Sequence, residues 1–157
     1  MKPVLDRLAL GLATLFGVGR LPYAPGTYGA LFAFPIWWLL SSVSAPVRGV
    51  AVLTAVCAAV AIADRAGRVL GDSDASSIVI DEVVGCLLAL VWFPPSWFVA
   101  CVAFTLFRVF DINKPWPIGW LDSRTSSGLL CVLDDLVAGV YAALVTYVAC
   151  VARAQLP

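Results

Sequence analysis

The sequence contains no histidine and few charged residues. Without histidine, any mechanism that uses an imidazole as base, nucleophile or metal ligand is excluded. Charged residues make up 13% of the chain, against about a quarter in soluble domains. Hydrophobic residues make up 62%, and the mean hydropathy is +0.97. A water-soluble fold of 157 residues cannot bury so much apolar surface, so we expect one integral membrane domain, residues 1–157. The formal net charge of zero gives no support for a nucleic-acid partner.

The cysteines also lack a pattern that would give them a chemical role. The five cysteines form no CxxC pair, and all lie within or beside apolar runs. Isolated cysteines in such surroundings usually behave as small hydrophobic residues. We therefore expect neither a structural disulfide nor a thiolate metal site. No signal-peptide cleavage site follows the first apolar stretch.

The apolar runs predict an all-α, polytopic membrane protein. We expect an N-terminal interfacial helix and about five membrane-embedded helices, with polar loops at 17–26 and 64–77. The interfacial helix covers 4–18, and the membrane segments cover 28–40, 47–63, 83–93, 97–107 and 129–151. A full span needs about 20 residues, so the shorter runs must extend into their flanks or stop short of crossing.

The basic residues predict the orientation. With the N-terminus in the cytoplasm and alternating segments, eight of the ten basic residues fall inside and only Arg48 and Arg153 fall outside. The eight are Lys2, Arg7, Arg20, Arg65, Arg68, Arg108, Lys114 and Arg124. This is the positive-inside pattern. The N-terminus and the loops that carry these eight residues are thus expected on the cytoplasmic side of a membrane.

The same orientation brings five carboxylates to the cytoplasmic side: Asp81, Glu82, Asp111, Asp134 and Asp135. Carboxylates at membrane depth are costly and repel one another. Arg108 and Lys114 can relieve some of this repulsion, but a divalent cation relieves it better. With oxygen ligands only, the sequence favours Mg²⁺ over Zn²⁺.

Asp134 and Asp135 are the most informative pair. Acids in a first helical turn, such as Asp81 and Glu82, also suit the helix dipole, but two adjacent acids inside an apolar run have no capping role. Neighbouring helical positions point about 100° apart, so we expect one Asp to face a metal and the other a partner, and we favour Asp135 as the metal-facing one. Gly139, followed by Ala143, predicts a close approach of another helix.

Two further segments each allow a structural and a functional interpretation. Arg108, Asp111 and Lys114 share one helix face if the helix continues to Lys114, where Pro115 is expected to end it. They form either a surface ladder of ion pairs or a phosphate-binding set. Thr27 precedes an apolar helix, as an N-cap residue or as part of an anion site. The acidic stretch 71–77 superficially resembles the DxDx nucleophile motif of haloacid-dehalogenase phosphatases. The sequence does not predict the β-rich core that such a phosphatase needs, so we set this class aside.

Four segments in series resemble one known family. They are PYAPGTYGAL (22–31), SSIVIDEVVG (76–85), FRVFDINKPWPIGWLD (107–122) and LDDLVAGVYA (133–142). In order and spacing they are similar to the bacterial phosphatidylglycerophosphatase A family over residues 16–147. Before its Asp pair that family usually has a glycine-rich stretch, and here Ser127 and Leu130 stand in place of two of those glycines.

The resemblance implies Mg²⁺-dependent hydrolysis of phosphatidylglycerophosphate to phosphatidylglycerol and phosphate in the bacterial inner membrane. The asymmetry of the basic residues predicts that the active site lies at the cytoplasmic face. The resemblance also implies that the five carboxylates are catalytic, and that Glu82, Asp111, Asp134 and Asp135 hold the metal. Arg108 and Lys114 are then the phosphate-binding residues, and we add Thr27 and Arg20 as candidates. Either a water molecule or an aspartate is the nucleophile.

Other classes fit less well. Phosphatases of the vanadium-haloperoxidase type need histidine, cysteine phosphatases need Cys followed six residues later by Arg, and CDP-alcohol phosphotransferases carry a longer series of aspartates. The remaining alternative is a cation-coupled transporter or a membrane assembly subunit that uses the acidic cluster. A transporter places such acids near the midplane of the bilayer, whereas these are expected near one face.

Overall fold

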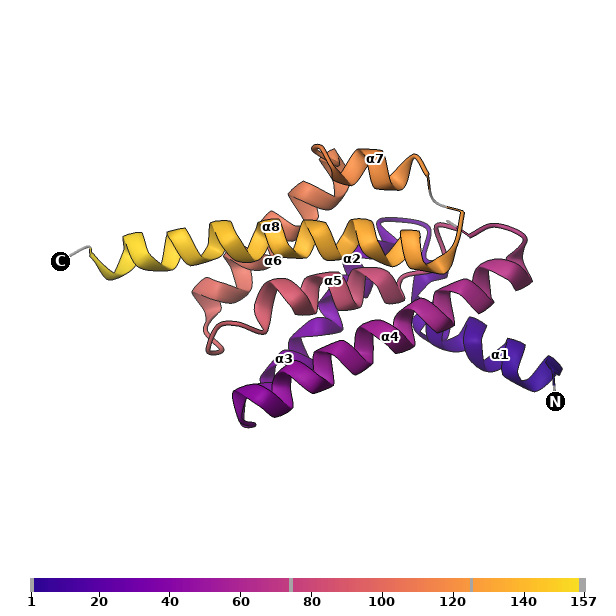
Figure 1. Ribbon diagram of the computed structural model, residues 1–157, viewed down its shortest axis with the longest axis horizontal. Helices are drawn as coiled ribbons and strands as arrows, with labels where there is room; N and C mark the ends of the chain where they lie inside the picture. The colour runs from indigo at the N-terminus through magenta and orange to yellow at the C-terminus, as the bar shows by residue number, and fades with distance from the viewer. Residues whose placement is uncertain (1, 74, 125, 156–157) are drawn as a thin grey trace.

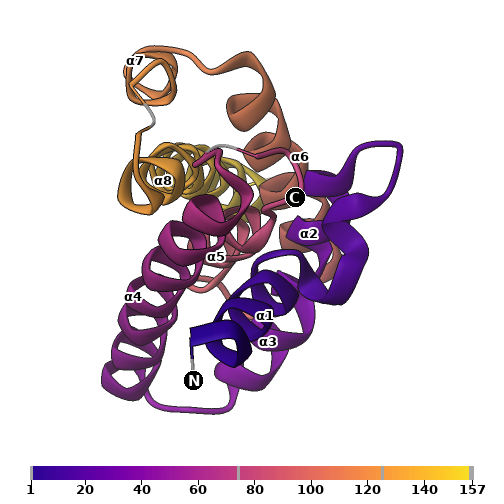
Figure 2. The ribbon, with the colours of Figure 1, turned by 90° about the vertical axis from the view of Figure 1, so that its right-hand side faces the viewer.

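The computed structural model describes residues 2–73, 75–124 and 126–155, and within them every regular element is helical. In chain order these elements are α1 (Lys2–Ala13), the 3₁₀ helix η1 (Leu15–Arg20), α2 (Pro25–Leu31), α3 (Ala33–Ser41), α4 (Ala45–Leu70), α5 (Ile80–Leu90), α6 (Trp97–Asn113), α7 (Ile118–Asp122) and α8 (Gly128–Ala154). The all-α prediction is confirmed. Helix α8 lies along the long axis with α4 and α5 beside it, and the two termini lie at opposite ends (Figure 1). Seen along that axis, α1 and α3 lie on the side away from α7 (Figure 2).

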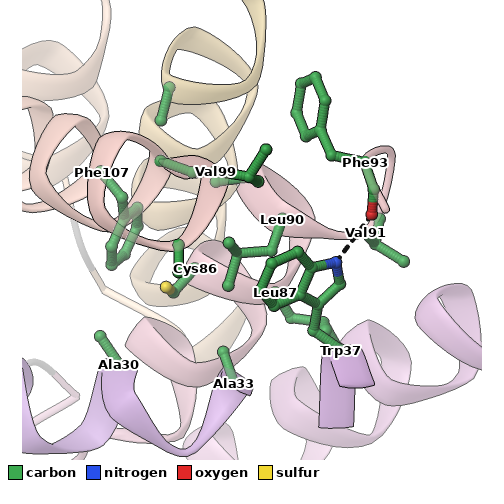
Figure 3. Close-up of a cluster of buried hydrophobic side chains, with 14 of the residues drawn as sticks. Ala30, Ala33, Trp37, Cys86, Leu87, Leu90, Val91, Phe93, Val99 and Phe107 are labelled. Atoms are coloured by element: carbon green, nitrogen blue, oxygen red, sulfur yellow. Dashed lines mark hydrogen bonds between the residues drawn. The ribbon is translucent and has the colours of Figure 1, made fainter. Parts of the chain in front are cut away.

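Helix α5 is the centre of the core. It packs against α2, α3, α4, α6 and α8. Its Leu87 and Leu90 are buried beside Trp37 and Phe107 (Figure 3), and the indole Nε1 of Trp37 donates a hydrogen bond to the carbonyl of Phe93 at 2.9 Å. The apolar composition of this helix therefore serves contacts within the protein.

Helices α5 and α8 approach closely because glycines face each other. A side chain on Gly139 would collide with the carbonyl oxygen of Gly85. A Cβ on Gly85 would lie 2.8 Å from the carbonyl oxygen of Asp135. The close approach predicted from Gly139 is confirmed, and it brings the first turn of α5 beside the aspartate pair of α8.

The prediction of five membrane segments needs correction. In the described part of the chain, only α4 and α8 are long and apolar enough to cross a membrane. The run 28–40 is divided between α2 and α3 at Phe32, and the run 83–93 ends before Pro94. The two long helices are antiparallel, because the C-terminal part of α4 meets the start of α8, where the backbone nitrogen of Gly128 lies 3.4 Å from Oδ1 of Asp64.

Several expected boundaries also differ. Helix α4 continues to Leu70, through the first half of the polar loop predicted at 64–77, because Asp64 and Arg68 form an i,i+4 ion pair on its surface. The expected N-terminal helix ends at Ala13 and is followed by η1. Thr27 is not an N-cap, since α2 already begins at Pro25, a residue that favours the first helical turn.

Candidate active site

A small polar pocket lies where α5 begins, α6 ends and the first turns of α8 pass. Its volume is about 90 Å³. Its lining residues are Ala75, Ser76, Ile78, Asp81, Glu82, Asp111, Lys114, Cys131, Asp134 and Asp135. All five carboxylates expected from the sequence therefore meet at one place, although they come from three helices.

Three of these carboxylates lie close enough to share one cation. Asp81, Glu82 and Asp135 each have an oxygen within 4.8 Å of the others. Asp81 and Asp135 are buried, and Oδ1 of Asp81 accepts a hydrogen bond from the backbone N–H of Glu82 at 3.0 Å. Oε2 of Glu82 is buried and has no hydrogen-bond partner among the described residues. A buried oxygen without a partner is costly unless a cation or water satisfies it.

The two adjacent aspartates have different partners. Asp135 belongs to the group of three, whereas Oδ2 of Asp134 accepts a hydrogen bond from Nζ of Lys114 at 3.1 Å. Oδ1 of Asp134 also accepts from the backbone N–H of Asp135 at 3.0 Å. The angular separation of neighbouring helical residues explains this difference. Asp135, rather than Asp134, thus belongs to the close group of carboxylates, and which of the two faces a metal stays a prediction.

Arg108 and Asp111 form an ion pair in the last turns of α6, with Nη1 of Arg108 at 2.5 Å from Oδ2 of Asp111. Both side chains are mostly buried, and Nε of Arg108 has no hydrogen-bond acceptor among the described residues. The missing side chain of Gly26 makes room here, because a Cβ at that position would collide with Glu82 and lie 3.3 Å from Arg108. The guanidinium is thus held beside the pocket with donor capacity to spare.

Lys114 does not continue the helical face that its spacing suggested. Helix α6 ends at Asn113, and Lys114 takes a left-handed conformation with φ of 45°. Its ammonium contacts both Asp134 and Asp122. Partial burial alone would lower the pKa of Lys114, but the hydrogen bonds and charges of Asp122 and Asp134 outweigh it and raise that pKa above its ordinary value.

Two predicted phosphate-binding residues lie apart from this group. Neither Arg20 nor Thr27 lines the pocket within the described structure. Arg20 is exposed at the end of η1, and Thr27 lies within α2. Their roles stay predictions, and it is Gly26, beside Thr27, that comes nearest to the carboxylates.

The sequence analysis missed two residues. The thiol of Cys131 donates to Oδ2 of Asp81 at 2.8 Å, so this cysteine is more than the small hydrophobic residue we expected. Its position three residues before Asp134, on the same helical face, was an available signal. Asp122, which pairs with Lys114, gave no signal, because the contact depends on how the chain turns between α6 and α7.

Comparisons with known proteins identify the family of the chain. The family model for phosphatidylglycerophosphatase A matches residues 11–150. Phosphatidylglycerophosphatase A of Escherichia coli K12 is 36% identical over 87% of this chain and 80% of its own length. Its Haemophilus influenzae counterpart is 36% identical over 87% of this chain and 85% of its own. A Bacteroides thetaiotaomicron protein, whose name proposes a phosphatidylinositol-3-phosphatase, is 35% identical over 88% and 91%. No solved structure matches the chain.

These findings define a helical phosphatase with a carboxylate-lined site. The chain belongs to the phosphatidylglycerophosphatase A family, as the four sequence segments indicated.

Proposed function

We propose that this protein is an Mg²⁺-dependent lipid phosphatase that hydrolyses phosphatidylglycerophosphate to phosphatidylglycerol and phosphate. The substrate is the one named by two of the relatives. The observation that carries the metal requirement is the excess of acid at the pocket. Five carboxylates from three helices meet there, and among the described residues their basic partners are Arg108 and Lys114. A doubly charged phosphate does not enter such a site unless a cation offsets the acids.

The residues present fit a hard divalent ion. All the donors of the close group of Asp81, Glu82 and Asp135 are carboxylate oxygens, which Mg²⁺ prefers. The unpartnered Oε2 of Glu82 supplies a ligand that nothing else in the described chain uses. Asp111 and Asp134, which the resemblance implied as metal ligands, line the same pocket outside this close group, whereas Asp81, expected to be catalytic but not a ligand, lies within it. When bound, Mg²⁺ supplies a Lewis acid for a phosphate oxygen and for the attacking water.

The chain's own residues supply the remaining chemistry. Arg108 and Lys114 neutralise charge on the equatorial phosphate oxygens as the bond to the leaving glycerol oxygen breaks. One carboxylate that is not engaged by the metal orients the attacking water and accepts its proton, which then passes to the leaving glycerol oxygen. If this carboxylate attacks phosphorus itself, the leaving oxygen takes a proton from water and a second water hydrolyses the aspartyl phosphate. The mostly buried position of Arg108 strengthens its interaction with the phosphate, because less water screens it.

We further propose that α4 and α8 cross the inner membrane and that the pocket lies near its cytoplasmic face. Only 11% of the most apolar stretch of α4 is buried, so most of this very apolar surface needs lipid around it. Exposed tryptophans, Trp92 and Trp97 at one end and Trp116 and Trp120 beyond the other end of α6, suit the two membrane interfaces.

The depth of the acids argues against a transporter. Helix α8 begins at Gly128, and Asp135 lies seven residues further on, about 10 Å along a helix that is roughly 40 Å long. The acids therefore lie well to one side of its midpoint. Transporters instead gather their ion-binding groups near the bilayer midplane.

The proposal is tested with purified protein in detergent. We expect phosphate release from phosphatidylglycerophosphate with Mg²⁺, none after EDTA, and recovery when Mg²⁺ is restored. Phosphatidylinositol 3-phosphate and phosphatidic acid, assayed in parallel, distinguish this substrate from the lipid named by the Bacteroides relative. Full activity in excess chelator would contradict the metal requirement. Faster hydrolysis of phosphatidylinositol 3-phosphate than of phosphatidylglycerophosphate would mean that the inositol lipid is the substrate.

A further inference from the structure

Lys114 and helix α7 form one structural unit. The ammonium of Lys114 contacts Asp122, the last residue of α7. Gly119 of α7 lies against the backbone of Lys114, where an added Cβ would be 2.8 Å from the carbonyl oxygen. Ile118 is fully buried in the main core and fixes the start of α7. Helix α7 therefore contacts both the backbone and the ammonium of Lys114.

Asp122 differs from the other acids near this lysine. Its side chain is 31% exposed, and it does not line the carboxylate pocket, whereas that of Asp134 is 8% exposed and does. An ammonium has three N–H donors. Asp122 and Asp134 each accept from Lys114, which leaves one donor for a phosphate oxygen.

We propose that Asp122 is a positioning residue that holds the Lys114 ammonium at the rim of the pocket, so that it faces a bound phosphate instead of pairing fully with Asp134. With a carboxylate on each side, the ammonium is held between them. Without Asp122, the flexible lysine stem lets the ammonium shift towards Asp134, away from the position in which it faces a bound phosphate. This inference rests on the proposed phosphatase function.

The chain offers a matched control. Asp6 pairs with Arg65 at 2.8 Å, and these side chains are 35% and 33% exposed, close to the 31% and 30% of Asp122 and Lys114. That pair joins α1 to α4 and lies outside the pocket. Asp6→Asn therefore removes a comparable ion pair with no route to the site.

The first readout separates binding from chemistry. For Asp122→Asn we expect the KM and the inhibition constant for inorganic phosphate to rise about three- to fivefold, because one partly exposed charge contact is lost. We expect kcat to fall by no more than a similar factor, because Lys114 also neutralises charge in the transition state. Asp122→Glu keeps the charge and should stay closer to wild type than Asp122→Asn. Asp6→Asn should match wild type in all three constants. Size-exclusion elution of each variant checks folding.

The second readout does not depend on activity. Lysine occurs only at positions 2 and 114, so in a Lys2→Arg background Lys114 is the one lysine. Its acetylation rate, followed by peptide mass at one pH, should rise severalfold in Asp122→Asn and stay constant in Asp6→Asn.

The proposal is overturned if Asp122→Asn matches Asp6→Asn in both phosphate inhibition and Lys114 acetylation. It is equally overturned if Asp122→Asn lowers kcat alone and leaves Lys114 acetylation unchanged, since Asp122 then acts elsewhere. If wild type shows no Mg²⁺-dependent hydrolysis, the proposed function fails, while the acetylation rates still decide whether Asp122 holds Lys114.

Discussion

The two ends of the molecule use their basic residues in different ways. At the end away from the pocket, Arg48 donates to the carbonyl oxygen of Val91 at 3.1 Å and to those of Ser41 and Val43, so it satisfies carbonyls where α3 and α5 end. At the pocket, Arg108 and Lys114 contact carboxylates instead. Arg48 completes backbone hydrogen bonding, whereas the acids of the pocket outnumber their basic partners. In the proposed function, it is this second end that binds the cation.

Helix α8 shows the same contrast along its own length. Its first half carries buried Asp134 and Asp135, and its second half exposes Leu144, Tyr147 and Val148. The buried acids are tolerated because α5 and α6 surround them, and the exposed apolar side chains suit lipid contact. One helix thus forms a wall of the pocket and also has the length and composition of a membrane span.

The sharpest test of the end that carries the pocket compares its two adjacent aspartates, Asp134 and Asp135. We expect Asp135→Asn to lower kcat/KM by about 10²-fold or more, because this carboxylate lies with Asp81 and Glu82 where the metal charge is needed. Asp134→Asn should be milder and partly restored by high Mg²⁺, since Asp134 pairs with Lys114. The measurement is kcat/KM against Mg²⁺ concentration, with folding checked by size exclusion. If both variants keep near-wild-type activity, the aspartate pair is structural.

A second test asks whether the two ends lie on opposite sides of the membrane. Asn113, beside the pocket, and Gln155, at the far end of α8, are both exposed. After replacement of the five native cysteines, we expect a membrane-impermeant thiol reagent to label Asn113→Cys in inverted vesicles only. Gln155→Cys should be labelled in right-side-out vesicles only, as the basic-residue asymmetry predicts. If both introduced cysteines are labelled from the same side, the two ends of the molecule do not lie on opposite sides of the membrane.

The sequence predicted the site better than it predicted the membrane segments. Charged residues inside apolar runs are rare and costly, so Asp134 and Asp135 marked the site without any knowledge of the fold. An apolar run such as 83–93 is ambiguous, because packing inside a protein and contact with lipid demand the same side chains. Helix α5 proved to be surrounded by protein. The pairing of Lys114 with Asp122 depends on the left-handed turn at Lys114, which composition does not encode.

The smallest expected effect tests the close contact between α8 and α5. Gly139 was predicted as a contact point, but its partner Gly85 was not, because nothing in the sequence says which helix lies opposite. Gly139→Ala places a methyl group against the backbone of Gly85, which cannot move aside as a flexible side chain can. We expect a loss of about 1–3 kcal/mol of stability, the usual cost of an overpacked core.

Gly49→Ala in α4 is the matched control, because an added Cβ there meets nothing within 4 Å. It should leave stability unchanged or raise it slightly, since alanine favours a helix more than glycine does. Thermal unfolding in detergent, followed by loss of the monodisperse size-exclusion peak, measures both variants. Because Gly85 lies three residues after Glu82 and against the carbonyl of Asp135, displacement of α5 by Gly139→Ala should also reduce activity. Equal stability of the two variants would mean that α5 and α8 are not in close contact, and the pocket between them would then need another explanation.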